Sequence, residues 1–130
     1  MGSEMCIRDS NKAVTAFRPS LTVSTGSVLT KEEKFQQGTG VNLTPPPLNL
    51  ISQRACEAAV ENAKEIARHL GLRSVARIDA FLKCDSGELK VFEINTTPAM
   101  TPATVIFHQA VDKGLSPRRL IEEIIEDTST

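Results

Sequence analysis

Four polar residues stand at alternating positions in two neighbouring stretches: Arg77 and Asp79 in V-A-R-I-D-A-F-L, and Glu93 and Asn95 in L-K-V-F-E-I-N. Alternate side chains of a β-strand point to the same face, so each pair shares a face if both stretches are strands. Carboxylate and amide oxygens are ligands that Mg²⁺ prefers, and the planar guanidinium of arginine pairs well with phosphoryl oxygens. Together the four residues would suit a magnesium ion that carries nucleotide phosphates.

The segment between the two stretches sets their register. Asp85-Ser86-Gly87 is typical of a hairpin loop, because it joins two runs that alternate in hydrophobicity. If these three residues form the whole loop, Cys84 lies opposite Glu88. We therefore expect an antiparallel hairpin over residues 73–96.

Counting back from that loop, Asp79 lies opposite Glu93, and Arg77 lies opposite Asn95. Directly opposed side chains have Cβ atoms about 5 Å apart, and two like charges at that distance are destabilising. A divalent cation between the carboxylates would remove the repulsion, so we expect Asp79 and Glu93 to share metal, with Asn95 as a further ligand. The alternative is that these charges form only the solvated face of an ordinary hairpin.

The segments R-I-D-A-F-L and F-E-I-N-T-T-P-A-M-T-P resemble the C-terminal signature of the ATP-grasp ligases, and of the D-alanine–D-alanine ligase family in particular. The resemblance covers about residues 31–125. It implies that Asp79, Glu93 and Asn95 bind two Mg²⁺ ions, with Mn²⁺ as a possible substitute, and that Glu93 also contacts ATP. It implies that Arg77 helps to hold an acyl-phosphate intermediate, so we expect Arg77 to serve the reaction rather than the fold.

The same resemblance implies roles for residues outside the hairpin. Residues 31–47, with two glycines and three consecutive prolines, would form a lid loop in which Lys34 reaches the nucleotide phosphates. Ala99 stands where the family usually has a glycine whose backbone N–H stabilises an oxyanion, which makes it a catalytic position. Thr104 and Val105 would bind the second D-alanine.

A helix over residues 52–70 is predicted to support the hairpin. Ser52 is a good N-cap, and Gly71 suits the residue after the last turn. Apolar residues recur at i, i+3 and i+4 spacing: Ala55, Cys56, Ala59, Val60, Ala63, Ile66, Ala67 and Leu70. We expect this stripe to pack on the apolar face of the hairpin.

Two more helices are predicted over residues 101–127. Thr101-Pro102 would begin the first, which Gly114 ends, and Ser116-Pro117 would begin the second. Residues 13–17 and 21–23 are expected to be short strands. The predicted fold class is therefore α+β, the C-terminal half of an ATP-grasp domain, with an antiparallel sheet flanked by three helices.

Residues 1–10, M-G-S-E-M-C-I-R-D-S, show no periodicity and match nothing in the resemblance. We expect them to be an unrelated leader that takes no part in the fold, introduced by cloning or sequence assembly. The partial ATP-grasp domain would then cover residues 11–130.

Composition excludes several classes of protein. The net charge is −1 over 130 residues, which does not favour nucleic-acid or membrane-surface binding. No apolar run approaches the length of a membrane span, and no signal peptide is visible. Three cysteines without metal-site spacing favour a reducing compartment. We therefore expect a cytoplasmic protein. The resemblance implies that its partners are small molecules, ATP and D-alanine, with a homodimer possible in the full-length parent.

The resemblance implies an ATP- and Mg²⁺-dependent ligase that joins two D-alanines through an acyl phosphate for peptidoglycan precursor synthesis. Two alternatives stay open: another ATP-grasp carboxylate–amine ligase with a different acceptor, and a non-catalytic nucleotide-binding module. The family's N-terminal domain, which holds the first D-alanine, has no counterpart in this sequence. Its adenine pocket and central-domain lysines have none either. We therefore expect these 130 residues alone to be inactive.

Overall fold

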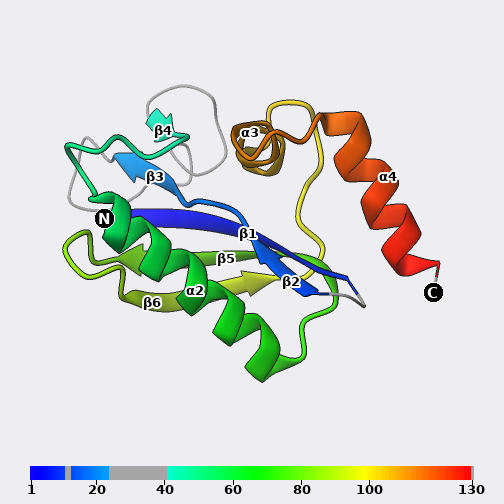
Figure 1. Cartoon of the computed structure of the whole chain (residues 1–130), viewed down its shortest axis with the longest axis horizontal. Helices are drawn as coiled ribbons and strands as arrows, with labels where there is room; N and C mark the ends of the chain where they lie inside the picture. The colour runs from blue at the N-terminus through cyan, green and yellow to red at the C-terminus, as the bar shows by residue number, and fades with distance from the viewer. Residues whose placement is uncertain (11–12, 24–40, 130) are drawn as a thin grey trace.

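The structure, a computed structural model, describes residues 1–10, 13–23 and 41–129 of the chain. Its centre is an antiparallel sheet with strand order β4-β3-β1-β5-β6, in which β2 also pairs with β1. The strands are β1 (Gly2–Ser10), β2 (Ala13–Ala16), β3 (Ser20–Val23), β4 (Val41–Leu43), β5 (Ser74–Leu82) and β6 (Leu89–Asn95). Figure 1 shows helix α2 crossing the strands, with α3 and α4 grouped away from it. The α+β fold class and the flanking helices are confirmed.

The expectation that residues 1–10 stand outside the fold is wrong. Strand β1 lies between β3 and β5, and it pairs with β5 from Gly2 to Asp9. Met5, Cys6 and Ile7 are all buried, because β1 is covered on both faces. A strand that is buried on both faces loses the polar–apolar alternation by which strands are recognised. The expectation that residues 1–10 were introduced by cloning or sequence assembly stays a prediction.

One face of the sheet packs against helix α2 (Gln53–Leu70). Side chains of β1 and β5 join those of the helix in a single cluster: Met5, Ile7, Ala76, Ile78, Ala80 and Leu82 from the strands, and Ala55, Cys56, Ala59, Ala63 and Ala67 from the helix. The small residues of α2 let the helix lie close to the sheet. The predicted helix and its packing on the hairpin are confirmed, except that Leu70, at the end of the predicted stripe, is 57% exposed.

Both caps of α2 also agree with the sequence. The Ser52 hydroxyl accepts a hydrogen bond from the Ala55 N–H at 3.1 Å. Gly71 has φ of 61°, a left-handed conformation that ends the helix, and its N–H donates to the last carbonyls of the helix.

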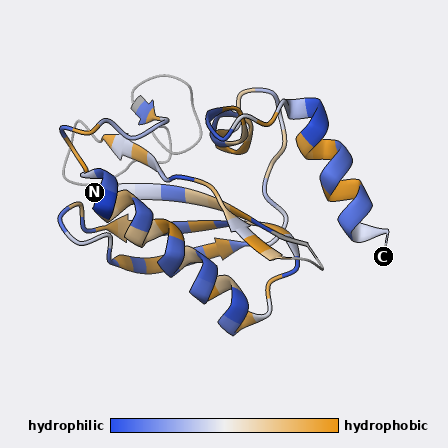
Figure 2. Cartoon of the chain, viewed as in Figure 1, coloured by the Kyte–Doolittle hydropathy of each residue, from blue (hydrophilic) through white to orange (hydrophobic). Residues whose placement is uncertain are grey.

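The other face of the sheet is covered only in part, by α3 (Val105–Asp112) and α4 (Pro117–Thr128). A second cluster joins these helices to Cys6 of β1 and Val75 of β5: its helical members are Ile106, Phe107, Ala110 and Leu120. Figure 2 shows hydrophilic and hydrophobic bands alternating along α4. Of the apolar residues of α4, only Leu120 is fully buried, and Ile121 and Ile125 are exposed.

Two predicted boundaries differ from the structure. Helix α3 begins at Val105 and not at Pro102, because both the N–H and the hydroxyl of Thr104 bond to the Thr101 carbonyl and close a separate turn first. Strand β4 lies within the predicted loop over residues 31–47, where it pairs with β3. Its three residues end just before the prolines, which cannot donate to a ladder.

The buried side chain of Gln109 links α3 to the sheet. Strand β1 changes partner from β3 to β2 near its middle, where the edge of the sheet is interrupted. At that point the Gln109 amide accepts from the Cys6 N–H at 3.0 Å and donates to the Glu4 carbonyl at 2.8 Å. It thereby satisfies two backbone groups that the break would leave unpaired.

No helix in the described part of the chain is long and apolar enough to cross a membrane.

Candidate functional site

The hairpin of β5 and β6 opposes Asp79 to Glu93 and Arg77 to Asn95, as the sequence predicts. The turn that produces this register differs from the predicted one. The turn is one residue longer than expected, because Lys83 and not Cys84 pairs with Glu88, through a hydrogen bond of 2.9 Å.

A β-bulge compensates for the longer turn. Ala80 pairs with Val91 while Asp79 pairs with Glu93, so Phe92 is the extra residue on β6. The bulge shifts the register by one residue, which cancels the shift made by the turn. The two carboxylates therefore lie opposite each other only because both irregularities are present.

Asp79 is buried and is held by Arg77. The Arg77 Nε donates to Asp79 Oδ1 at 2.8 Å and the Nη2 donates to Oδ2 at 3.0 Å, a bidentate pair between neighbours on one face of β5. The Asp79 side chain is 2% exposed and that of Arg77 is 20% exposed. These hydrogen bonds raise the pKa of Arg77 above its ordinary value.

This ion pair gives Arg77 a structural partner, and the expectation that Arg77 serves the reaction rather than the fold stays a prediction. Removing one partner of a buried ion pair leaves an uncompensated charge and is strongly destabilising. Arg77 therefore neutralises Asp79 in the folded protein whatever else it does.

The other two predicted ligands are more accessible. Glu93 is exposed, on the strand next to Asp79. The Asn95 Oδ1 accepts a hydrogen bond from the Thr97 N–H at 2.9 Å, so this amide shapes the turn that follows β6. Within residues 1–10, 13–23 and 41–129, no three His, Cys, Asp or Glu side chains form a group that could hold a metal ion. The predicted set has two carboxylates and one amide, so its oxygens suit Mg²⁺ in chemistry, and their role as ligands stays a prediction.

The remaining predicted residues lie after the hairpin or outside the described chain. Ala99 is exposed in the segment between β6 and α3. Thr104 is the N-cap residue of α3, but its hydroxyl donates to the Thr101 carbonyl at 2.7 Å and makes no side-chain cap. Val105 begins the helix and is buried. Lys34 and most of the predicted lid loop lie among residues 24–40, which are not described.

Comparison with known proteins identifies the family to which the chain belongs. Residues 3–126 match the family described as "D-ala D-ala ligase C-terminus". The chain belongs to this ligase family. The match begins inside β1, so it includes most of the stretch that the sequence pattern had excluded.

Curated relatives of this ligase family are longer than the chain. A D-alanine–D-alanine ligase of Carboxydothermus hydrogenoformans is 31% identical over 94 residues, which are 72% of this chain and 29% of that protein. The chain thus spans less than a third of the length of this ligase.

Solved ligase structures share the fold. The VanG D-Ala:D-Ser ligase of Enterococcus faecalis superposes with a TM-score of 0.77 at 21% identity, over 96% of this chain and 35% of that one. The Bacillus anthracis D-alanine–D-alanine ligase complexed with ATP superposes with a TM-score of 0.63 at 19% identity, over 98% of this chain and 38% of that one.

Beside the carboxylates lies an exposed aromatic pair that sequence reasoning missed. Phe81 shares the face of Asp79, and its ring centroid is 5.1 Å from that of Phe92, the bulge residue. Phe81 is 54% exposed and Phe92 is 49% exposed. The period-2 pattern marked Phe81 as a neighbour of Asp79, but it placed Phe92 on the opposite face. The bulge is what brings the two rings together.

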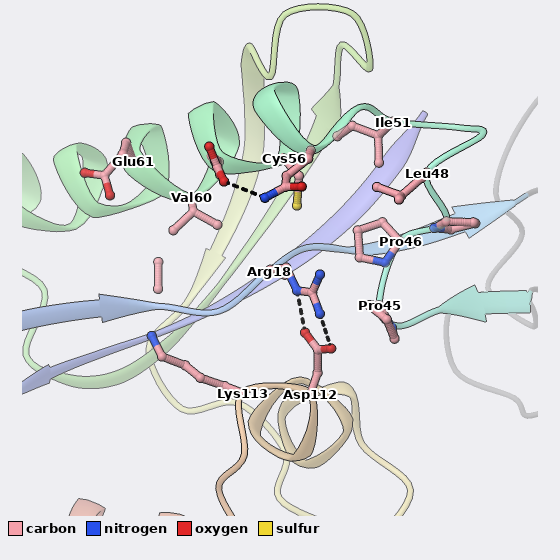
Figure 3. A pocket seen from close by; sticks show the side chains of 14 residues that line it. Arg18, Pro45, Pro46, Leu48, Ile51, Cys56, Val60, Glu61, Asp112 and Lys113 are labelled. Atoms are coloured by element: carbon pink, nitrogen blue, oxygen red, sulfur yellow. Dashed lines mark hydrogen bonds and ion pairs between the residues drawn. The ribbon is translucent and has the colours of Figure 1, made fainter.

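A separate pocket of about 980 Å³ contains none of the predicted site residues. Figure 3 shows it between α2, the proline-rich loop before α2, and the end of α3. Arg18 donates from its Nε to Asp112 Oδ2 at 2.7 Å across one side, and this bonding raises the pKa of Arg18. Burial raises the pKa of the Cys56 thiol in the wall and lowers that of the Lys113 ammonium.

Proposed function

We propose that this chain supplies the metal- and acceptor-binding part of an ATP-dependent D-alanine–D-alanine ligase. The observation that carries the proposal is the opposition of Asp79 and Glu93 across a hairpin, with Arg77 and Asn95 on the same face. Membership of the ligase family and the ATP complex of the B. anthracis neighbour support it. The product would serve peptidoglycan precursor synthesis, in the cytoplasm.

Each residue of the face has a proposed task. Asp79, Glu93 and Asn95 would hold Mg²⁺, which supplies charge neutralisation to the phosphates of ATP when bound. Arg77 would orient the phosphoryl group of an acyl phosphate with its guanidinium. The exposed rings of Phe81 and Phe92 offer an apolar surface on which a nucleotide base could pack.

The segment after β6 would handle the acceptor. The N–H groups at the start of α3 point away from the helix and favour an anionic group. We propose that Thr104 and Val105 receive the carboxylate of the second D-alanine there, and that the Ala99 N–H stabilises the oxyanion formed when the amine attacks. Lys34 would reach the phosphates of ATP from the predicted lid loop.

Nucleotide binding tests this proposal directly. The full chain should bind Mg²⁺–ATP in calorimetry, and Glu93→Gln should weaken the binding by about tenfold or more, since it removes one metal-ligand charge. Glu88→Gln is the matched control, because Glu88 is exposed at the hairpin turn and makes the same change in charge. Equal affinity of the two variants would contradict the proposal.

A second assay tests the acceptor and the alternatives. D-alanine should strengthen Mg²⁺–ATP binding if the two sites adjoin, whereas a non-catalytic nucleotide-binding module predicts no effect of any amino acid. Preference for D-serine or a D-hydroxy acid would indicate a ligase with a different acceptor. Phosphate release by these 130 residues should be negligible, because binding energy from groups outside them is needed for turnover. Turnover within about tenfold of an intact relative would refute this last point.

A further inference from the structure

The pocket beside α2 contains an arginine that is fixed on one side and free on the other. Arg18 donates from Nε to Asp112 Oδ2 at 2.7 Å and from Nη2 to Oδ1, so Asp112 occupies one edge of the guanidinium. The Asp112 side chain is 9% exposed and that of Arg18 is 50% exposed. In the part of the chain that the structure describes, nothing accepts a hydrogen bond from Nη1 of Arg18. The edge formed by Nη1 and the outer N–H of Nη2 is therefore available to an anion.

The free edge of Arg18 lies at the pocket. Figure 3 shows the guanidinium between Asp112 and the wall that contains Cys56. Burial raises the pKa of the Cys56 thiol, and the charge of Arg18 opposes this rise, so the guanidinium lies near the thiol. The bond to Asp112 fixes the guanidinium before any ligand arrives, which lowers the conformational entropy that binding costs. Such an edge matches the two oxygens of a carboxylate.

The acidic residues of the pocket do not block this edge. Five charged residues of the described chain line the pocket: Arg18, Glu57, Glu61, Asp112 and Lys113. Arg18 neutralises Asp112, and the Nζ of Lys64 lies 2.6 Å from Oε1 of Glu61. Glu57 is exposed, so water screens its charge. The acids therefore repel an anion only weakly.

Lys113 is a cation that makes no ion pair with any described residue. Its Nζ lies 5.8 Å from the centre of the Phe17 ring. Burial lowers the pKa of Lys113, and repulsion from Lys64 and Arg8 lowers it further. A partly desolvated ammonium is stabilised by a counter-ion. Lys113 therefore adds to the attraction that Arg18 offers to an anion.

The remaining walls of the pocket are apolar. They come from β2, the proline-rich loop and α2: Ala16, Pro45, Pro46, Pro47, Ile51 and Val60. The pocket volume is about 980 Å³, at the upper end of the roughly 300–1,000 Å³ that small-molecule sites occupy. Apolar walls with a few placed polar donors favour a ligand that has an apolar body and one charged group.

We propose that this pocket binds a small organic carboxylate with an apolar body, such as an aromatic acid. The carboxylate accepts hydrogen bonds from the free edge of Arg18, and Lys113 adds electrostatic attraction. The apolar body lies against the prolines and α2. No described residue of the proposed metal and acceptor site lines the pocket, so this inference does not rest on the proposed ligase function. Either proposal can fail without the other.

The experiment compares two fluorescent probes on the full chain, 2-naphthoate and 2-naphthamide, which have the same rings and differ in charge. The protein has no tryptophan or tyrosine to interfere with their emission. Wild-type protein should bind 2-naphthoate at least about tenfold more tightly than 2-naphthamide, because only the carboxylate makes charge-assisted hydrogen bonds with Arg18. Equal affinities would mean that only the apolar walls bind, and would overturn the proposal. Failure to bind 2-naphthoate would also overturn it.

Substitution of the two cations tests their tasks separately. Arg18→Lys keeps a positive charge beside Asp112 but has no second edge, so its affinity for 2-naphthoate should fall about tenfold while that for 2-naphthamide stays unchanged. Lys113→Gln should weaken 2-naphthoate about threefold. Arg73→Lys is the matched control, because Arg73 is exposed before β5 and outside the pocket. Circular dichroism checks that each variant is folded. Equal weakening of both probes in Arg18→Lys would mean that Arg18 only maintains the pocket, and would overturn its role.

Two cysteines of the wild-type chain locate the bound probe. Cys56 lines the pocket and is 6% exposed, whereas Cys84 is partly exposed and does not line the pocket. At a concentration about tenfold above its Kd, 2-naphthoate should slow the reaction of Cys56 with methyl methanethiosulfonate about tenfold, since the occupied pocket shields the thiol. The reaction of Cys84 should keep its rate, and mass spectrometry follows both. An unchanged rate at Cys56 would mean that the probe binds elsewhere, and would overturn the proposal.

Discussion

The two faces of the sheet differ in the side chains they present and in how fully the helices cover them. Towards α2, strands β1 and β5 present apolar side chains that are almost fully buried against small helical residues. Towards α3 and α4, β5 presents Arg77, Asp79 and Phe81, and the helices cover only part of that face. The apolar packing that stabilises the sheet thus lies mainly on the α2 face, and the proposed site lies on the other face. The pair of Arg77 and Asp79 has a structural role as an ion pair and a proposed role in the chemistry.

The largest effect should come from removing residues 2–10, which contribute to both faces. Without β1 the strands β3 and β5 lose their common partner, and the clusters on both faces lose their central members. The loss should exceed the whole stability of a domain this size, about 5–15 kcal/mol. Thermal melting followed by circular dichroism should show no cooperative transition, and a transition of normal amplitude would contradict the structure.

Leu82 and Phe81 are neighbours on β5 that point to opposite faces, so their substitution compares the stability that each face contributes. Leu82 is 2% exposed on the α2 face, so Leu82→Ala should lower the free energy of unfolding by about 2–5 kcal/mol. Phe81 is larger but lies on the other face and contacts Phe92, so Phe81→Ala should cost only about 0.5–1.5 kcal/mol. Urea unfolding measures both, and a larger loss for Phe81→Ala would mean that the second face also carries the core.

Gly87 of the hairpin turn lies against helix α2, so a substitution there measures how closely the turn and the helix pack. A Cβ at Gly87 would lie 2.2 Å from the Ala55 carbonyl oxygen, and φ there is +77°. Gly87→Ala should therefore cost about 2 kcal/mol or more. Gly114 has φ of +86° with nothing within 4 Å of an added Cβ, so Gly114→Ala should show the backbone cost alone, about 1 kcal/mol. Equal losses in urea unfolding would mean that the turn does not touch the helix.

The smallest effect is a pH dependence from Cys6 on the second face. Burial raises the pKa of this thiol well above its ordinary value of 9.0. A group whose pKa is raised by folding contributes stability below the unfolded pKa and loses it as pH rises, because only the unfolded state then releases the proton. Stability should thus fall above pH 9 by up to about 1.4 kcal/mol per pH unit from this group. Cys6→Ala should reduce that slope, and an identical slope in urea unfolding would contradict the assignment.

Local signals determined much of the molecule in advance. Ser52, Gly71 and the alanine stripe define α2 because capping and helical periodicity depend on residues within one helix. Alternation within each strand placed Arg77 beside Asp79 and Glu93 beside Asn95. The resemblance carried by these segments is enough to identify the ligase family.

The opposition of Asp79 and Glu93 was predicted correctly by an incomplete argument. The predicted loop was one residue too short, and the bulge at Phe92 was not foreseen. A bulge depends on how two strands twist against each other and against the rest of the sheet, so neither strand shows it alone.

Only the tertiary structure decided two further points. Residues 2–10 became a central strand because β3, β5 and two layers of helix supply partners that no short window contains. Arg77 was predicted for phosphate and lies against Asp79, because a charge that is removed from water takes whichever opposite charge the folded chain brings within reach.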